Sequence, residues 1–183
     1  MNKIILYIAT SKDGFIADKN GGVDWLPQPK NDQDLEVFGY KKLMQRIDTI
    51  LMGSNSFQQI IGFGDWAWAD KQTYVFSSKP LKSPHSYITI TNSNPVQFIQ
   101  NLKNRASDKD IWLLGGAELA KSFDQEDLID EIILTIVPQT LEEGILLDLS
   151  FTSFHLSQEK QMMDGIIQKR YVTIHQNKNT TQS

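Results

Sequence analysis

Two strand ends in this sequence carry the residue types that bind phosphate groups. Each follows a continuous apolar run, and they read Met52-Gly53-Ser54-Asn55-Ser56 and Leu114-Gly115-Gly116-Ala117. Glycine lets the backbone approach a ligand closely, serine hydroxyls donate to phosphate oxygens, and the helix expected after each turn offers unpaired N–H groups. Either turn alone is equally consistent with a plain strand end or with tight strand–helix packing. The two turns together favour a bound pyrophosphate.

A third strand end, Ser77-Ser78-Lys79, could bind one further phosphate through its hydroxyls and the lysine charge. The alternative interpretation is a simple polar turn before Pro80. The usual dinucleotide fingerprint is missing, because Gly62-Phe63-Gly64 lies in a tryptophan-rich loop rather than between a first strand and a helix. A Gly-Lys-Ser or Gly-Lys-Thr phosphate loop is also absent from the sequence. The chain is therefore not expected to be a nucleoside triphosphatase.

Few side chains are candidates for moving a proton. Asp32 and Asp34 open the first expected helix, where a carboxylate would face the mouth of the sheet, although acids that merely cap a helix are common there. Thr135 lies in a buried strand, and we expect its hydroxyl to find an inward carboxylate or a ligand as partner. The three histidines lack a metal-binding spacing and cysteine is absent, so we expect no metal site.

Alternating strands and helices must position these residues. Apolar runs between turn residues predict strands at 3–9, 48–53, 73–76, 86–90, 110–114 and 131–137. Helical spacing and capping residues predict helices from residue 31 over three to four turns, after 54–56, after Asn94-Pro95 and from about 116 to 123. Segment 11–26 is rich in turn residues and is expected to be a mobile loop. A last antiparallel pair, 154–159 and 166–174, joined around Asp164-Gly165, completes an α/β fold with a mostly parallel sheet and an antiparallel C-terminal edge.

Composition narrows the class of protein. With 183 residues, 40% of them hydrophobic and 22% charged, the chain is expected to form one domain over residues 1–176 and a polar tail at 177–183. A net charge of −4 argues against a nucleic-acid groove, which needs clustered Lys and Arg. The first apolar run is too short to span a membrane. The lack of cysteine suits a reducing compartment, and we expect a cytoplasmic protein without nucleic-acid or membrane partners.

Seven segments, taken in order, carry a resemblance to a known family. They are Tyr7-Ile8-Ala9, Asp13-Gly14-Phe15-Ile16-Ala17, Asp24-Trp25-Leu26, Ile50-Leu51-Met52-Gly53, Val75-Phe76-Ser77-Ser78, Leu113-Leu114-Gly115-Gly116-Ala117 and Leu134-Thr135. As an ordered set they resemble the dihydrofolate reductase superfamily over nearly the whole chain. Within it, residues 11–17 and 128–131 look most like the reductase half of bifunctional riboflavin deaminase-reductases and their small stand-alone relatives.

This resemblance implies an NADPH-dependent hydride transfer to a small heterocycle, on a three-layer fold with a twisted sheet of about eight strands. By position, the residues implied to bind the cofactor are Ala9, Ile16, Gly53, Ser54, Ser56, Ser77, Ser78, Lys79, Gly115, Gly116 and Ala117. The first two would touch the nicotinamide end, and the serine–lysine turn would meet the adenosine 2′-phosphate. The catalytic carboxylate maps best to Asp34, with Asp32 as its rival and Thr135 as its buried hydroxyl partner.

Three functions follow as alternatives. The first is a reductase that resembles 5-amino-6-(5-phosphoribosylamino)uracil reductase of riboflavin biosynthesis. The second is a pterin reductase like dihydrofolate reductase, although this chain has only Lys71 where those enzymes hold the folate tail with arginine. The third is a catalytically silent nucleotide-binding protein, in which Trp66 and Trp68 form an aromatic wall or a partner surface rather than simple loop packing. The resemblance and an exposed C-terminal edge strand also predict a homodimer.

Overall fold

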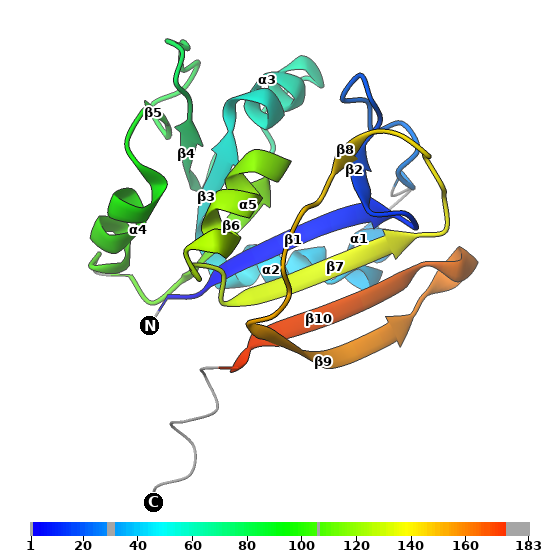
Figure 1. The fold of residues 1–183 in the computed structure, drawn as a ribbon. Helices are drawn as coiled ribbons and strands as arrows, with labels where there is room; N and C mark the ends of the chain where they lie inside the picture. The colour runs from blue at the N-terminus through cyan, green and yellow to red at the C-terminus, as the bar shows by residue number, and fades with distance from the viewer. Residues whose placement is uncertain (1, 29–31, 106, 175–183) are drawn as a thin grey trace, which may run out of the picture.

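The protein is built around one eight-stranded sheet, seen in a computed structural model that describes residues 2–28, 32–105 and 107–174, apart from the side chains of 32–34 (Figure 1). The strands lie in the order β5-β4-β3-β6-β1-β7-β10-β9. Their bounds are β1 Ile4–Ser11, β3 Ile47–Gly53, β4 Gln72–Phe76, β5 Ile88–Thr91, β6 Asp110–Gly115, β7 Glu131–Val137, β9 Phe154–Gln161 and β10 Ile167–Thr173. The helices are α1 Asp32–Val37, α2 Tyr40–Arg46, α3 Ser54–Gly62, α4 Pro95–Lys103 and α5 Ala117–Gln125.

The sheet joins parallel and antiparallel strands in the way that the sequence predicts. β1 carries the fully buried Ile4, Ile5 and Leu6, and it lies between β6 and β7, parallel to both. β10 and β9 continue the sheet beyond β7 as its antiparallel edge. A strand that is apolar on both faces needs helices on both sides, which is why continuous apolar runs mark the central strands. The expected α/β fold is confirmed.

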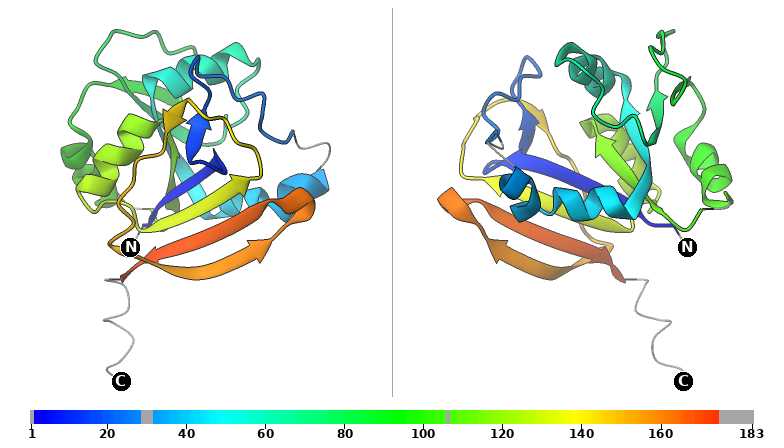
Figure 2. Two further views of the ribbon diagram at one scale, coloured as in Figure 1. Left: turned by 45° about the vertical axis from the view of Figure 1, so that its right-hand side comes forward. Right: turned by 180° about the vertical axis from the view of Figure 1, so that it is seen from behind.

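Helices cover both faces of the sheet and make three layers (Figure 2). On one face, Ile99 of α4 and Phe123 of α5 pack against β1, β6 and β7. On the other face, Leu43 of α2 and Phe57 of α3 pack in a second buried cluster with residues of β3 and β4. Asn94 begins α4 as expected, because its side-chain oxygen accepts from two backbone N–H groups of the first turn.

The first helix differs from its expected form. The sequence predicts one helix of three to four turns from residue 31, but the structure has two short helices, α1 and α2. The break lies at Phe38 and Gly39, where Gly39 has a φ of 75°, in the left-handed region that favours glycine. The hydrophobic spacing continues across the break, so periodicity alone does not reveal it.

A second, two-stranded sheet lies outside the sequence-based expectation. β2 (Phe15–Ala17) pairs antiparallel with β8 (Ile145–Leu146). The Asp13 carboxylate strengthens this pairing by accepting from two backbone N–H groups of the loop after β7, at 2.8 and 3.2 Å. Gly144 permits the close approach, since a Cβ there would lie 2.3 Å from the carbonyl oxygen of Ala17. Segment 11–26 is expected from the sequence to be a mobile loop, but this pairing anchors its first half.

Two further expectations concern the C-terminal end of the chain and membrane-spanning helices. The expected domain boundary at residue 176 and the polar tail at 177–183 lie outside the described residues. Within residues 2–28, 32–105 and 107–174, none of the helices is both long and apolar enough to cross a membrane. The cytoplasmic location stays a prediction.

Candidate functional site

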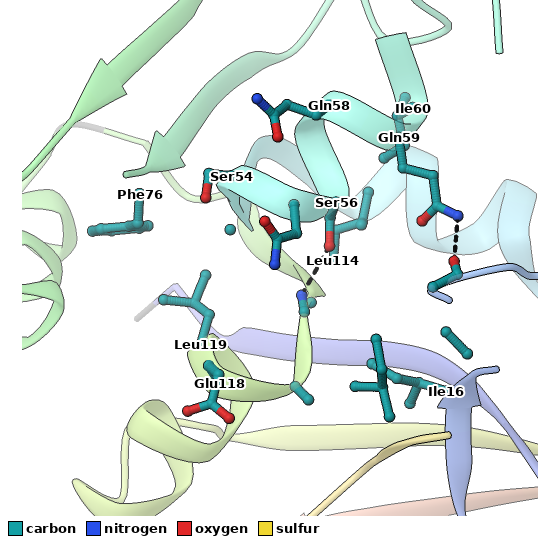
Figure 3. A pocket seen from close by; sticks show the side chains of 18 of the residues that line it. Ile16, Ser54, Ser56, Gln58, Gln59, Ile60, Phe76, Leu114, Glu118 and Leu119 are labelled. Carbon is teal, nitrogen blue, oxygen red and sulfur yellow. Dashed lines mark hydrogen bonds between the residues drawn. The ribbon is translucent and has the colours of Figure 1, made fainter. Parts of the chain in front are cut away.

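A cavity of about 1060 Å³ opens between α3 and α5 at the carboxyl ends of the central parallel strands. Ten of the eleven residues expected to bind a cofactor line it: Ala9, Ile16, Gly53, Ser54, Ser56, Ser77, Ser78, Gly115, Gly116 and Ala117. In the close-up, Ser54 and Ser56 face the cavity from α3, and Glu118 and Leu119 come from the start of α5 (Figure 3). The cavity thus occupies the place where open α/β sheets bind ligands.

Strand register brings the two glycine turns together. β3 pairs with β6 in parallel and Met52 lies opposite Gly115, so both strands end at the same level. A Cβ on Gly53 would meet the carbonyl oxygen of Gly115 at 3.9 Å. Gly115 itself has a φ of +128°, a conformation that side-chain-bearing residues rarely adopt. The two glycine turns that the sequence suggests as a joint site therefore lie next to each other in the structure.

Ser56 joins these turns by a hydrogen bond. Its hydroxyl oxygen accepts from the backbone N–H of Gly116 at 3.1 Å, as the dashed line in Figure 3 shows. A serine hydroxyl that accepts one bond still has its own proton to donate. The Ser56 hydroxyl is consequently oriented by α5 and keeps a donor for a ligand in the cavity.

Both helices that begin at these turns leave backbone N–H groups without side-chain caps. Neither Gly53 before α3 nor Gly116 before α5 provides a side-chain cap bond, and both residues line the cavity. Unpaired N–H groups and the helix dipole together favour an anion at such a place. Glu118 in the first turn of α5 also lines the cavity and places a negative charge there. The cavity thus offers an anion backbone N–H groups and serine hydroxyls, next to one carboxylate.

The serine–lysine turn lies beside the main cavity. Ser77 accepts from the backbone N–H of Lys79 at 3.1 Å and donates to its carbonyl oxygen at 2.7 Å. The polar-turn alternative therefore describes the Ser77 side chain well. Lys79 does not line the main cavity, but it lines an adjoining one of about 390 Å³ together with Ser77 and Ser78.

The expected proton-handling residues are not brought together in the described part of the structure. Asp32 and Asp34 lie in α1, and their side chains are outside the described residues. Thr135 is buried, with 7% of its surface exposed, and it does not line the cavity. Its hydroxyl accepts from the side-chain amide of Gln168 at 3.0 Å. The partner is therefore another strand residue, where the sequence suggested a carboxylate or a ligand.

Two aromatic residues that sequence reasoning did not select line the cavity. Tyr7 donates from its hydroxyl to the carbonyl oxygen of Phe38 at 3.1 Å, and burial, helped by Tyr40, raises the pKa of Tyr7 to about 12. Trp112 donates to the Tyr7 carbonyl oxygen at 3.3 Å and lies beside it in the wall. The available signal was strand periodicity, since Tyr7 lies two residues before Ala9 and so shares its face.

The tryptophan-rich loop packs behind this wall. The Trp68 ring meets that of Trp112 edge-on at 5.2 Å, and Trp66 meets Trp68 at 5.3 Å. The Trp68 indole N–H donates to the Tyr40 hydroxyl at 2.6 Å. Edge-to-face contacts of this kind stabilise a core. The structure thus supports the loop-packing interpretation of Trp66 and Trp68.

Comparison with known proteins shows the family to which this chain belongs. Residues 2–147 match the RibD C-terminal domain. The chain belongs to that family. Two proteins of Bacillus subtilis strain 168 are similar to this chain. The first, uncharacterized protein YwjB, is 36% identical over 144 residues, which cover 78% of this chain and 80% of YwjB. Uncharacterized protein YyaP is 38% identical over 154 residues and covers 78% of both chains.

Solved structures agree with the assignment to the RibD C-terminal domain family. A proposed riboflavin biosynthesis protein from Shewanella sp. PV-4 has a TM-score of 0.79 and 31% identity, covering 93% of this chain and 98% of that one. Dihydrofolate reductase from Enterococcus faecalis, solved with NADP(H), has a TM-score of 0.68 and 16% identity over 94% and 96% of the chains. The Thermotoga maritima deaminase/reductase has a TM-score of 0.66 and 15% identity over 94% and 56%. The fold is that of the dihydrofolate reductase superfamily, as the sequence resemblance implies.

This RibD C-terminal domain member shows no group of three or more metal-ligating side chains within the described ranges. Its cavity instead combines glycine turns, uncapped helix starts and an aromatic wall. These features can bind an anionic, partly aromatic molecule. Family and geometry together indicate a reductase-type domain.

Proposed function

We propose that the protein is an NADPH-dependent reductase of a small heterocycle, of the type that acts on 5-amino-6-(5-phosphoribosylamino)uracil. The observation that carries this proposal is the pair of uncapped helix starts at Gly53 and Gly116, which share one cavity and are joined by Ser56. Helix N-termini that follow glycine turns bind the pyrophosphate of dinucleotides in other α/β proteins. Membership of the RibD C-terminal domain family supports the same reaction class.

The residues present fit a dinucleotide along the whole cavity. The turns at Gly53 and Gly115 provide room for a pyrophosphate, because neither has a side chain to obstruct it. Ala9 and Ile16 line the region proposed for the nicotinamide ring. Ser78 and Lys79 line the adjoining cavity proposed for the adenosine 2′-phosphate. When bound, the cofactor supplies the hydride, and the protein orients the rings and excludes water.

A heterocyclic substrate is proposed to lie at the end of the cavity that Tyr7 and Trp112 line. Aromatic side chains suit a flat ring because they offer large apolar area with a polar group at the edge. We propose that Asp34 supplies the proton, with Asp32 as the alternative. Both residues lie in α1. Thr135 is proposed to act at a distance, through Gln168 and the carbonyl oxygen of Phe38.

A pterin reductase of the dihydrofolate type is the weaker candidate. Lys71 is the one cation that the sequence offers near the folate-clamp position, and its side chain is only 12% exposed. It donates to Asp70 at 2.6 Å and does not line the cavity. A cation that is already paired cannot hold the folate tail as an arginine fork does.

The first experiment is a parallel titration with NADPH and NADH, followed by quenching of tryptophan fluorescence. Trp112 lines the cavity and provides the signal. Binding of NADPH in preference to NADH is expected, and binding of neither would contradict the proposal. Oxidation of NADPH with the aminouracil ribosyl phosphate is then compared with oxidation by dihydrofolate. Turnover of the first alone fits the proposed class, and absence of turnover with either would favour a silent nucleotide-binding protein.

A further inference from the structure

Few charged side chains border the cavity. Among the lining residues that the structure describes, Lys19 and Glu118 are the charged ones. Lys19 lies in the turn after β2, where it is bound to Glu143 at 2.6 Å. Glu118 lies in the first turn of α5, two residues after Gly116. The start of α5 therefore has a carboxylate beside it, and neither glycine turn contains a cation.

The Glu118 carboxylate is not neutralised by the cation that follows it on α5. Lys121 is one turn further along the helix, at a spacing that allows an ion pair with Glu118. Lys121 is instead bound to Asp148 at 2.6 Å. The hydrogen bond and the charge of Asp148 raise the pKa of Lys121, and the charge of Glu118 contributes less. In Figure 3, Glu118 lies at the start of α5, across the cavity from Ser54 on α3.

A carboxylate at this place opposes some phosphate groups more than others. A pyrophosphate that is esterified at both ends, as in a dinucleotide, carries one negative charge on each phosphate, whereas a terminal phosphate carries nearly two at neutral pH. Backbone N–H groups and serine hydroxyls donate to either kind. Repulsion by a carboxylate grows with each added charge, whereas a lysine or arginine would favour the more highly charged group. The cavity is therefore suited to phosphates of low charge.

We propose that Glu118 is a specificity-determining residue, which selects the internal pyrophosphate of a dinucleotide against the terminal phosphates of nucleoside di- and triphosphates. This selection rests on the proposed function, because it assumes that a dinucleotide binds at the two glycine turns. Adenosine di- and triphosphate share the adenosine half of the cofactor, so a site built only from neutral donors does not reject them. Glu118 acts through its charge and is not a catalytic residue.

The test compares the wild type with Glu118→Gln, which removes the charge and keeps the length of the side chain. The two ligands are NADPH and 2′-phospho-ADP, which is the adenosine half of NADPH with a terminal diphosphate. Dissociation constants are measured by isothermal titration calorimetry at low salt and without divalent cations, because both would screen the charges. We expect Glu118→Gln to bind NADPH roughly three-fold and 2′-phospho-ADP roughly ten-fold more tightly. Equal gains for the two ligands, or no gain, would overturn the proposal.

Two further variants separate the local charge of Glu118 from its shape and from the net charge of the protein. Glu126→Gln makes the same change at an exposed position at the other end of α5, away from the cavity, and it should leave both dissociation constants unchanged. Glu118→Asp keeps the charge and should keep the wild-type ratio of the two constants. If Glu118→Asp loses selectivity as Glu118→Gln does, shape rather than charge is responsible, and the proposal is wrong.

A third ligand distinguishes failure of this proposal from failure of the proposed function. Inorganic pyrophosphate needs only the two glycine turns, and its binding is followed by phosphorus NMR. If NADPH does not bind the wild-type protein, the proposed function fails, and pyrophosphate then decides about Glu118. Stronger binding of pyrophosphate to Glu118→Gln than to the wild type supports selection by charge, whereas equal binding or no binding to the two proteins overturns it.

Discussion

The side-chain amide of Gln168 lies 3.0 Å from the hydroxyl oxygen of Thr135, and it also donates to the carbonyl oxygen of Phe38 at 3.0 Å. Thr135 is in β7, Gln168 is in the neighbouring β10, and Phe38 is in the break between α1 and α2. Tyr7 of β1 donates to the same Phe38 carbonyl oxygen. The helix break next to the proposed catalytic carboxylates is thus held directly by two strands, β1 and β10, and Thr135 of β7 is bonded to the Gln168 amide that holds it.

Thr135→Val removes the hydroxyl from this network without changing the shape of the side chain. We expect the free energy of unfolding to fall by about 1 kcal/mol, because a buried hydrogen bond is lost. Urea denaturation measures the change. Thr140→Val, at an exposed position of the loop after β7, is the control and should change stability by less than about 0.5 kcal/mol. A neutral Thr135→Val would show that the hydroxyl is not a structural acceptor.

Glu131 lies at the other end of β7 and binds two arginines. Its side chain is 0% exposed, and its oxygens accept from Arg46 and Arg170 at 2.8 to 3.2 Å. Burial alone would raise the pKa of Glu131, but the bonds and charges of the two arginines outweigh burial and hold the pKa below its usual value. Protonation therefore costs more in the folded state than in the unfolded state.

Acid should weaken the protein through this carboxylate. Because the folded-state pKa is lowered, its stabilising contribution is complete above the ordinary carboxyl pKa and is lost as the pH falls below it. Glu131→Gln should lower the free energy of unfolding at pH 7 by about 3 kcal/mol, since two arginines lose their charged partner. Urea midpoints measured from neutral to acid pH should fall less steeply in the variant. Parallel pH curves would contradict this role of Glu131.

Ser56→Ala should weaken NADPH binding by about ten-fold, because it removes a hydroxyl donor to phosphate. The dissociation constant is measured by tryptophan fluorescence. Ser86→Ala, at an exposed position outside both cavities, is the control and should bind NADPH as the wild type does. Unchanged binding in Ser56→Ala would remove this serine from the proposed pyrophosphate site.

Lys79→Gln should lower the preference for NADPH over NADH. We expect NADPH to bind about five-fold more weakly at low salt, while NADH binding stays the same, because only NADPH carries the 2′-phosphate. Lys82→Gln makes the same change of charge three residues away and is the control. If Lys79→Gln weakens both cofactors equally, the lysine acts on overall charge and does not recognise the 2′-phosphate.

The homodimer remains a prediction of the sequence resemblance. β9 is the last strand of the sheet and is exposed along most of its length. Light scattering combined with size-exclusion chromatography should give twice the mass of one chain. The mass of a single chain at micromolar concentration would contradict the dimer.

Much of the fold was predictable because its signals are local. Apolar runs marked the central strands, Asn94-Pro95 marked the start of α4, and the turn at Asp164-Gly165 marked the final antiparallel pair. The helix break at Gly39 was missed because the apolar spacing continues through it. The pairing of β2 with β8 was missed because a two-residue strand has no pattern of its own and its partner is far along the chain.

The sequence by itself determined the types of element and the two glycine turns that line the cavity, since these depend on residues within a few positions of each other. Tertiary structure alone decided which polar groups meet. Ser56 bonds to Gly116 and Gln59 to Gly21 because strand order and helix placement bring them together. Thr135 is bonded to Gln168 because antiparallel register puts them opposite each other. A polar side chain has several suitable partners in any sequence, and only packing selects one of them.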